Sequence, residues 1–239
     1  AERMAGYSTS HAYISLSAPY IKSVNSQGVV AVSDPEQEII PEDVERVIEA
    51  ARAISLPASQ EILHVIPRDF TLDGQGGVVD PVGMSGVRLE VETHIVTAST
   101  PALRNLRKCI KEAGIVPLDF VYSGFAASEA VLTPTEKELG VVLVDIGAAT
   151  TTLTIYSEGA PCYSSVLPIG AKNVTNDLAI GLRLSLDEAE KLKKALSKQD
   201  LDKDEVSLAE LKVSHEEKKV STKTAIDGII VPRLQEIFT

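Results

Sequence analysis

Hydrophobic and polar residues alternate through much of the first hundred positions, and this period of two predicts β-strands. In the longest such run, residues 87–98, aliphatic side chains fall on one face and charged side chains with His94 on the other, so we expect one face to pack and the other to meet water. Apolar residues at helical spacing begin at Pro41, with acids in the first turn, which predicts a helix. We therefore expect a small α+β unit over residues 12–98. Its expected strands are residues 12–18, 29–32, 61–66 and 87–98, with a turn at 25–28 and a glycine-rich loop at 70–86.

Strands and helices alternate along the rest of the chain, which predicts an α/β arrangement. The helix predicted at residues 186–196 has Ser185 before it and Glu188 three residues after Ser185, the spacing of a capping box. Residues 197–220 are highly charged and are expected to be a solvated face or loop. Residues 1–7 are typical of the end of a helix and residues 228–239 of an amphipathic helix, so we expect an internal piece of a longer protein. The expected strands are 116–122, 141–144, 152–156 and 166–169, and the expected helices are 101–113, 125–132, 173–180 and 186–196.

The charge, cysteine and histidine content excludes some classes of function. A net charge of −11 argues against a nucleic-acid surface, which needs clustered Lys and Arg, but allows a nucleotide, which needs only local positive potential. Cys109 and Cys162 are far apart and neither has a CxxC partner, which favours a reduced cytosolic setting. The four histidines show no metal-ligand spacing, so a zinc site is not expected. His64 and His94 fall inside strand patterns, and we interpret them as packed strand residues rather than catalytic groups.

Residues 141–156 carry the strongest chemical signal, because two apolar runs flank a turn of small residues. The first run leads to Asp145, and Gly147 and threonines 150–152 follow. In several ATP-binding folds such a turn points backbone N–H groups and hydroxyls at phosphates, while the carboxylate faces magnesium, usually through water. Small residues let the backbone come close to the phosphates. The pattern also suits an ordinary β-hairpin, and the chain has no GxxxxGK[ST] or GxGxxG motif, so both interpretations stay open at this point.

Several segments, in the correct order and over most of the chain, together resemble the FtsA family of bacterial actin-like cell-division proteins. The combination of PVGMSGVR at 81–88 with the hairpin at 141–156 is specific, because ordinary actins and MreB lack the first piece. The matching segments are NSQGVVAVS at 25–33, ILHVIPRDFTLDG at 62–74, DPVGMSGVRLEVETHIVTAS at 80–99, ELGVVLVDIGAATTTLTIYSEGA at 138–160, VLPIGAKNVTNDLAIGLRLSLDEAEKLK at 166–193 and the closing IIVPRL.

The resemblance implies an α/β fold with an actin-like, ribonuclease H-like core that carries an inserted α+β subdomain and is incomplete at both ends. The inserted SHS2-like subdomain would be residues 12–98, preceded at 1–11 by the end of a helix of the first core lobe. That lobe would continue over residues 99–135, and residues 136–239 would form the second lobe and the start of its outer subdomain. The first phosphate motif and the glycine-rich adenine motif would then lie outside the chain, which would leave half of a nucleotide site.

Three groups of residues match the family's nucleotide motifs by position. The first is the second phosphate motif, in which Asp145 would face Mg²⁺ through water. The second is the turn behind the phosphates, and the third is a helix pair that contacts ribose and adenine. The two members of that pair lie three residues apart on one helical face, and without the family a plain surface ion pair is the simpler interpretation. The residues are Asp145, Gly147, Ala148, Ala149, Thr150, Thr151 and Thr152 for the phosphate motif, Gly170 and Asn173 for the turn, and Glu190 and Lys193 for the helix pair.

Two departures from the family pattern bear on the chemistry. Ala148 and Ala149 stand where glycines are common, and if either needs a positive φ, the alanine costs about 1 kcal/mol and phosphate contact would be altered. In filament-forming relatives an acidic residue before this motif positions the attacking water. A gapless count back from Asp145 places Ser123 and Gly124 there. Because serine is a poor base, we expect slow ATP hydrolysis or none, and the sequence assigns no catalytic residue.

The resemblance therefore implies a protein that binds ATP and Mg²⁺, polymerises with itself and links the FtsZ ring to the inner membrane. Later divisome proteins would bind residues 12–98, and membrane attachment would come only through a C-terminal helix absent from this chain. The protein would lie on the cytoplasmic face of the bacterial cell membrane at the division site, without a nucleic-acid partner. Two alternatives remain: a PilM-like platform protein of type IV pili, and a sugar or acid kinase on the same core, whose general base the sequence does not show.

Overall fold

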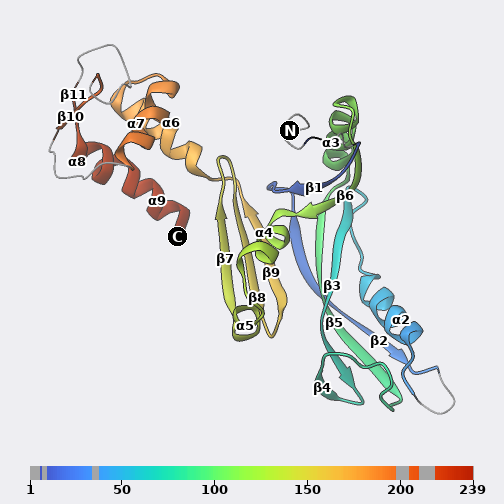
Figure 1. Ribbon diagram of the computed structural model, residues 1–239. Coiled ribbons are helices and arrows are strands. Elements are labelled where there is room, and N and C mark those ends of the chain that lie inside the picture. The colour runs from blue at the N-terminus through green and yellow to red at the C-terminus, as the bar shows by residue number, and fades with distance from the viewer. Residues whose placement is uncertain (1–5, 7–9, 34–37, 198–204, 210–218, 239) are drawn as a thin grey trace. The chain divides into compact units, whose positions relative to one another are not determined.

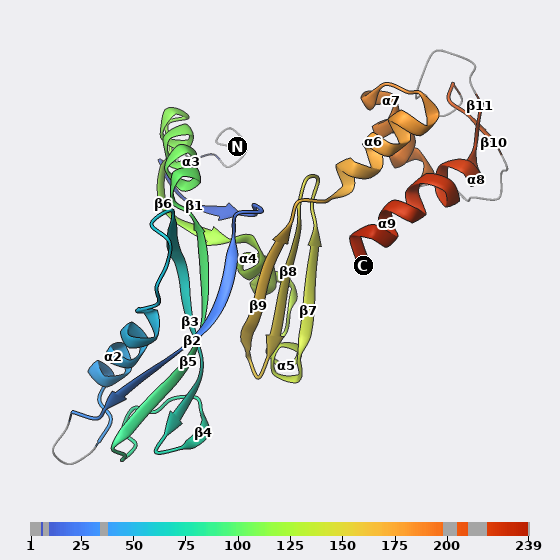
Figure 2. The same ribbon diagram turned by 180° about the vertical axis from the view of Figure 1, so that it is seen from behind.

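The computed structural model describes residue 6 and residues 10–33, 38–197, 205–209 and 219–238. The chain forms two compact units, seen from opposite sides in Figures 1 and 2. The N-terminal helix end expected at residues 1–7 and most of the charged stretch 197–220 lie outside the described residues. The first unit is residues 1–145 with 152–167, and the second is residues 146–151 with 168–239.

An antiparallel four-stranded sheet, in the order β2-β5-β3-β4, forms much of the first unit (Figure 1). Helix α2 begins at Pro41 as predicted and lies along β2 and β5. Its buried Val47 joins Leu89 and Val91 of β5 in one apolar cluster. Residues 22–99 thus have the α+β character expected of residues 12–98. The strand expected at residues 12–18 is not part of this sheet, because residues 11–16 pair with residues 116–122. The elements are β2 (Lys22–Ala31), α2 (Pro41–Arg52), β3 (Gln60–Leu72), β4 (Gln75–Val78) and β5 (Arg88–Ser99).

The turn predicted at residues 25–28 is wrong, because these residues lie inside β2. Gly28 serves a different purpose there. A Cβ on Gly28 would lie 2.2 Å from the carbonyl oxygen of Val47 and 2.6 Å from the amide nitrogen of Ala51. The glycine therefore lets the backbone of α2 approach the strand closely instead of bending the chain.

The loop predicted at residues 70–86 is wrong in its first part, which contains a hairpin between β3 and β4. Asp73 and Gly74 connect the two strands, and both have positive φ, 49° and 83°. An Asp-Gly pair with positive φ at both positions is the preferred two-residue hairpin turn. The glycine content of the segment therefore marks a tight turn between strands rather than a continuous loop.

A second part of the first unit is built on two parallel strands and two helices. β1 pairs with β6, and α3 follows β5 directly. Leu103 of α3 is fully buried beside Phe120 and Tyr122 of β6, and Leu106 and Ile110 pack against the same cluster. These apolar residues at helical spacing therefore form the inward face of the helix. The elements are β1 (His11–Leu16), α3 (Thr100–Glu112), β6 (Val116–Tyr122) and α4 (Ser123–Val131).

The candidate phosphate motif lies in a three-stranded sheet of order β7-β8-β9. The Tyr122 hydroxyl donates to the carbonyl oxygens of Leu153 at 2.8 Å and Ser165 at 3.0 Å, which ties β6 to β8 and β9. The strand predicted at residues 166–169 begins earlier than expected, because β9 continues the hairpin from β8. The elements are α5 (Pro134–Leu139), β7 (Val141–Ile146), β8 (Thr151–Ser157) and β9 (Ala160–Leu167).

His94 is fully buried, which contradicts the prediction that its face of β5 meets water. Its Nδ1 lies 2.7 Å from Asn25 Oδ1 of β2, and its Nε2 lies 2.9 Å from Ser164 Oγ of β9. β9 contacts β5 here, so both faces of the C-terminal half of β5 are covered. The interpretation of His94 as a packed strand residue is confirmed.

The second unit is mainly helical (Figure 1). Its core is a cluster that includes Leu178 of α6, Leu192 of α7 and Leu208, all fully buried. The capping box predicted at the start of α7 is confirmed, since Ser185 N donates to Glu188 Oε2 at 2.9 Å and Glu188 N donates to Ser185 Oγ at 3.3 Å. The elements are α6 (Ala171–Leu182), α7 (Leu186–Leu196), β10 (Glu205–Ser207), β11 (Lys219–Ser221), α8 (Thr222–Ala225), the π-helical turn η1 (Ile226–Ile230) and α9 (Val231–Phe238).

Candidate functional site

The turn between β7 and β8 is the centre of the predicted phosphate motif. Its ends are joined by a hydrogen bond from the amide of Gly147 to the carbonyl oxygen of Thr150, 2.9 Å long. Neither Ala148 nor Ala149 has a positive φ. The condition under which these alanines would add strain is therefore not met, and the turn accepts alanine at both positions.

The N-terminus of α6 docks directly on this turn. The amide of Ala171 donates to the carbonyl oxygen of Gly147 at 2.9 Å, and the amide of Lys172 donates to the carbonyl oxygen of Ala148 at 2.8 Å. Gly170 makes the approach possible, because a Cβ there would lie 2.6 Å from the Gly147 oxygen and 2.7 Å from the Ala148 oxygen. The structure thus brings Gly170 against the β7–β8 turn, residues 147–150, which is the predicted phosphate motif and is called here the phosphate turn.

Asn173 organises the first turn of α6 from within the helix. Its side-chain Oδ1 accepts a hydrogen bond from the backbone amide of Gly170 at 3.1 Å, and its backbone amide donates to the Gly170 carbonyl oxygen at 2.9 Å. This reciprocal pair satisfies donors that a helix start otherwise leaves unpaired. Asn173 therefore shapes the helix start that docks on the phosphate turn.

The threonines of the motif differ in where their hydroxyls point. Thr151 and Thr152 are buried. The Thr151 hydroxyl donates to the carbonyl oxygen of Ile169 at 2.8 Å, and Thr152 Oγ1 lies 2.8 Å from Ser17 Oγ and 3.4 Å from Ser123 Oγ. These two hydroxyls thus bond to protein groups. Thr150 is partly buried within the turn, and Asp145 is exposed near the end of β7.

Glu190 and Lys193 of α7 form a small polar network with Thr175 of α6. Lys193 Nζ lies 2.7 Å from Glu190 Oε2 and donates to Thr175 Oγ1 at 2.8 Å, and the Thr175 hydroxyl donates to the same carboxylate oxygen at 2.6 Å. The hydrogen bonds from Lys193 and Thr175 lower the pKa of Glu190 to about 2. Lys193 also donates to the carbonyl oxygen of Ala171 at 3.2 Å, in the first turn of α6. The predicted helix pair is therefore an ion pair that also connects α7 to the docked end of α6.

These elements of the second unit surround a pocket of about 630 Å³, a volume typical of small-molecule sites. The predicted site residues that line it are Gly147, Ala148, Glu190 and Lys193. The predicted residues that do not line it are Asp145, Ala149, Thr150, Thr151, Thr152, Gly170 and Asn173. Lining residues that the sequence reasoning missed are Ile146, Ala171, Lys172, Thr175, Asn176, Leu186 and Asp187.

Helical spacing gives a signal that would have found several of the missed residues. Lys172 and Asn176 lie four residues apart on α6, and Asp187 lies three residues before Glu190 on α7. Residues at these spacings share a helical face. The pairing of α6 with α7 turns these two faces toward one pocket, and no single-helix pattern contains that pairing.

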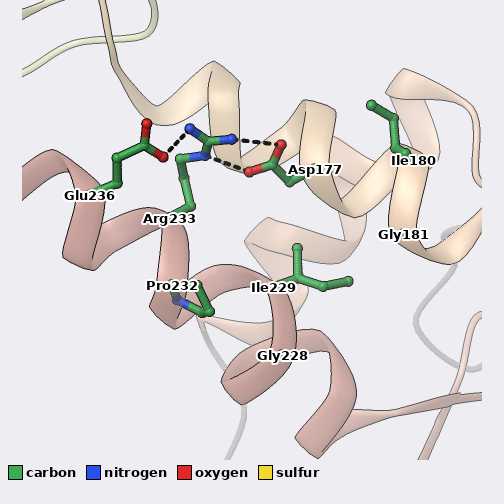
Figure 3. Close-up of a pocket in the computed structure, with 8 residues that line it drawn as sticks. All are labelled: Asp177, Ile180, Gly181, Gly228, Ile229, Pro232, Arg233 and Glu236. Carbon is green, nitrogen blue, oxygen red and sulfur yellow. Dashed lines mark hydrogen bonds and ion pairs between the residues drawn. The ribbon is translucent and has the colours of Figure 1, made fainter.

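A second pocket, of about 330 Å³, lies between α6, η1 and α9 in the same unit (Figure 3). Figure 3 shows Arg233 of α9 between two carboxylates, Asp177 and Glu236. Arg233 Nε lies 2.5 Å from Asp177 Oδ2 and its second terminal nitrogen 3.1 Å from Asp177 Oδ1, a two-pronged contact. This ion pair fixes α9 on α6, while Ile180, Ile229 and Pro232 supply apolar walls. None of the predicted site residues lines this pocket.

Comparison with known proteins identifies the family. The family model described as the SHS2 domain inserted in FtsA matches residues 19–97, and the model described as cell division protein FtsA matches residues 142–237. The chain belongs to the FtsA family. The first match falls on the α+β region and the second on the strands and helices that form the pocket. The family expected from the sequence is therefore confirmed.

Curated FtsA proteins resemble this chain over its whole length. The cell division protein FtsA of Pseudomonas aeruginosa is 39% identical over 249 residues, covering 100% of this chain and 57% of the relative. The FtsA of Bacillus subtilis is 41% identical over 240 residues, covering 100% of this chain and 54% of the relative. The chain thus spans a little over half the length of these FtsA relatives.

A solved structure confirms the fold class. The PilM-PilN type IV pilus biogenesis complex contains a chain that superposes with a TM-score of 0.54 at 20% identity, covering 90% of this chain and 53% of that chain. At this level of identity the likeness concerns the fold alone. Together with the FtsA models it supports the predicted α/β, actin-like architecture with an SHS2 insert.

Further observations concern metals, thiols and membranes. Among the described residues no group of three or more His, Cys, Asp or Glu side chains is placed to hold a metal ion. Cys109 and Cys162 are both free thiols. In the part of the chain that the structure describes, no helix has the length and apolar character needed to cross a membrane.

Proposed function

We propose that the pocket between the β7–β8 turn, α6 and α7 holds ATP with Mg²⁺ in an FtsA-family cell-division protein. The observation that carries the proposal is the shared pocket: Gly147 and Ala148 of the phosphate turn line it together with Glu190 and Lys193 of the helix pair. Two segments that match different nucleotide motifs and lie more than 40 residues apart thus meet at one cavity.

The charges around the pocket suit a nucleotide. Lys172 lines it and supplies local positive potential of the kind that a nucleotide's phosphates need, while Lys193 is paired with Glu190 in the helix pair assigned to ribose and adenine. Glu190 is ionised at neutral pH because its pKa is about 2, so its carboxylate would accept hydrogen bonds from ribose hydroxyls. Asp145 lies in β7, two residues before Gly147, and is exposed, and we assign it to hold Mg²⁺ through water. The bound nucleotide would supply the negative charge that these cations neutralise.

We propose that the nucleotide acts as a structural ligand rather than as a rapidly consumed substrate. At the position where relatives place an acid, Gly124 has no room for a side chain, since a Cβ would lie 2.2 Å from Thr154 Oγ1. Ser123 Oγ lies 3.4 Å from Thr152 Oγ1, and serine is a poor base. Binding would then stabilise the protein by RT ln(1 + [L]/Kd) without fast turnover.

The wider role follows from membership of the FtsA family. We propose an actin-like scaffold that polymerises, links the FtsZ ring to the inner face of the cell membrane at the division site, and recruits later divisome proteins through residues 12–98. The SHS2 model that matches residues 19–97 supports the assignment of the recruiting region.

The two alternative functions have less support. A PilM-like pilus platform shares the fold, but the family models that match this chain are both models of FtsA. A sugar or acid kinase needs a general base, and the expected position holds Ser123 and Gly124. Turnover in a phosphotransfer assay with hexoses or acetate would favour the kinase.

Calorimetric titration of the chain with ATP, in the presence and absence of Mg²⁺, tests the proposed site. Asp145→Asn keeps the shape of the side chain but removes its charge, so it should weaken binding of Mg-ATP at least ten-fold and leave binding of Mg-free ATP unchanged. Lys191→Gln, an exposed position on α7 outside the pocket lining, is the control and should bind like the unaltered chain. Equal Mg-ATP affinity in the Asp145 variant, or no nucleotide binding by the unaltered chain, would contradict the proposal.

A further inference from the structure

Helix α3 carries a cluster of four cations on one face: Arg104, Arg107, Lys108 and Lys111, called here the basic face. Their spacing of i, i+3, i+4 and i+7 places all four on the same side of a helix, along about 10 Å of its axis. All four side chains are exposed. The opposite face of the helix packs in the core through Leu103, Leu106 and Ile110, so the four cations stay on the outer face.

The cations of the basic face are little neutralised by their neighbours. Arg107 lies over the Phe120 ring, 5.3 Å from its centroid, a cation–π contact that leaves the charge in place. Lys108 is 3.9 Å from Glu112 with 78% of its side chain exposed, so this pair is weak. Within the described residues, that is the one ion pair that the four cations make. The surface therefore presents concentrated positive charge on a chain whose net charge is −11.

The overall negative charge does not cancel this local potential. Charges separated by more than about 8 Å are largely screened at physiological salt, so the cluster acts on a ligand mainly through its own four cations. The helix contains one acid, Glu112, at its end. A negatively charged surface that approached α3 would meet these cations first.

The shape of the basic face indicates what kind of surface it fits. A hollow of about 430 Å³ is lined by the four cations and Glu112, without an apolar residue. Peptides dock through apolar anchors in pockets, through main-chain pairing with a strand edge, or through an Arg cluster that binds an acidic motif, and this hollow offers neither of the first two. The third mode is the competing outcome that polyglutamate binding would reveal. Long mobile cations on one helix, without an anchor pocket, suit many equivalent phosphates on a fluid plane.

We propose that the basic face of α3 binds the anionic headgroups of a phospholipid membrane. This contact is independent of the nucleotide pocket, which belongs to the other compact unit. It is also independent of any helix outside this chain, so the chain itself would touch the membrane surface. Because no apolar residue lines the hollow, the contact is mainly electrostatic and weakens with salt.

Flotation of the 239-residue chain with lipid vesicles tests the proposal. Vesicles of phosphatidylcholine with one third phosphatidylglycerol should bind the chain, and vesicles of phosphatidylcholine alone should not. Each Lys or Arg at an anionic surface is worth about five-fold in affinity. The double variant Arg104→Gln, Lys111→Gln should therefore bind about 25-fold more weakly.

The matched controls separate a local effect from a change in net charge. Lys191→Gln with Lys223→Gln removes the same charge from exposed positions in the second unit and should change binding less than two-fold. Arg104→Lys with Lys111→Arg keeps both charges and should bind like the unaltered chain. Far-ultraviolet circular dichroism checks that each variant is folded.

Three results would overturn the proposal. The first is no flotation of the unaltered chain with anionic vesicles, and the second is that the Arg104→Gln, Lys111→Gln variant floats as well as the unaltered chain. The third is tighter binding of the unaltered chain to polyglutamate than to the vesicles, which would indicate an acidic protein partner. Calorimetry with ATP on the same α3 variant should give the affinity of the unaltered chain. Failure of the lipid contact is thereby distinguished from failure of the nucleotide site.

Discussion

Replacing Gly170 by alanine should displace the phosphate turn from α6. The new Cβ would lie 2.6 Å from the Gly147 carbonyl oxygen, 2.7 Å from the Ala148 oxygen and 2.8 Å from the Ala148 carbonyl carbon. All three atoms are backbone, so no side-chain rotation relieves the overlap. Either the turn or the start of α6 must move.

The size of the effect follows from three contributions. Overpacking of this kind costs about 1–3 kcal/mol. Separation of the turn from α6 also weakens two hydrogen bonds, from Ala171 and Lys172, worth about 0.5–1.5 kcal/mol each. Against this, alanine restricts the unfolded chain and returns about 0.4–1 kcal/mol. The backbone at Gly170 is extended, with φ −166°, so no further strain arises. The free energy of unfolding should fall by about 3 kcal/mol.

Urea unfolding with two probes can localise this loss. The chain has no tryptophan, and none of its six tyrosines lies within residues 146–151 or 168–239, so tyrosine fluorescence reports on the first unit. Circular dichroism at the helix band reports on the helices of both units, so a change seen by dichroism and not by tyrosine fluorescence belongs to the second unit. The Gly170→Ala variant should lose stability in the dichroism transition, and the amides of Ala171 and Lys172 should exchange hydrogen faster.

Gly228→Ala is the matched control, because its Cβ would have only Thr224 Cγ2 nearby, at 4.0 Å. Because Gly228 lies in a helix, this substitution should leave the free energy of unfolding unchanged or raise it by up to about 1 kcal/mol. If Gly170→Ala changed stability by less than about 0.5 kcal/mol and left amide protection intact, the close docking of α6 on the turn would be refuted.

Two further outcomes concern the first unit. Lowering the pH should destabilise the protein, because burial lowers the pKa of His94 from 6.5 to about 4, so that between these values only the unfolded chain takes up the proton. In urea unfolding, the free energy of unfolding should fall by about 2 kcal/mol between pH 6.5 and 5, and it should be fully present above pH 6.5. An equally steep pH dependence in His94→Gln would contradict this assignment. Gly124→Ala should lower the free energy of unfolding by about 1–3 kcal/mol, because its Cβ would lie 2.2 Å from Thr154 Oγ1. A tyrosine-fluorescence transition unchanged by Gly124→Ala would refute that contact.

Elements whose stability is local could be predicted from the sequence. The start of α2 at Pro41 and the whole of α7 agree with the structure, because proline, first-turn acids and the Ser185–Glu188 capping box act within one turn of the helix. The inward face of α3 was predictable for the same reason, since apolar residues at helical spacing define it.

Features that depend on packing between elements could not be predicted in this way. Residues 25–28 have the composition of a turn, yet Gly28 lies in a strand. Its role is set by α2, whose backbone would contact any side chain there. His94 follows the polar side of an alternating strand, but β9 covers that side with Ser164. The Asp73-Gly74 turn was a different case, because its signal was in the sequence and the glycine-rich context concealed it.

The candidate site combines both kinds of information, and this has a chemical consequence. The motif alone suggested that threonine hydroxyls face the phosphates, yet Thr151 and Thr152 donate to or contact protein oxygens, and neither lines the pocket. What lines the pocket is the turn itself at Gly147 and Ala148, together with the two lysines 172 and 193. We therefore expect the proposed site to recognise its ligand through charge and close backbone approach more than through hydroxyl contacts. Selection among nucleotides should then depend on the number of phosphates and on the walls of α6 and α7, whose pairing only the fold provides.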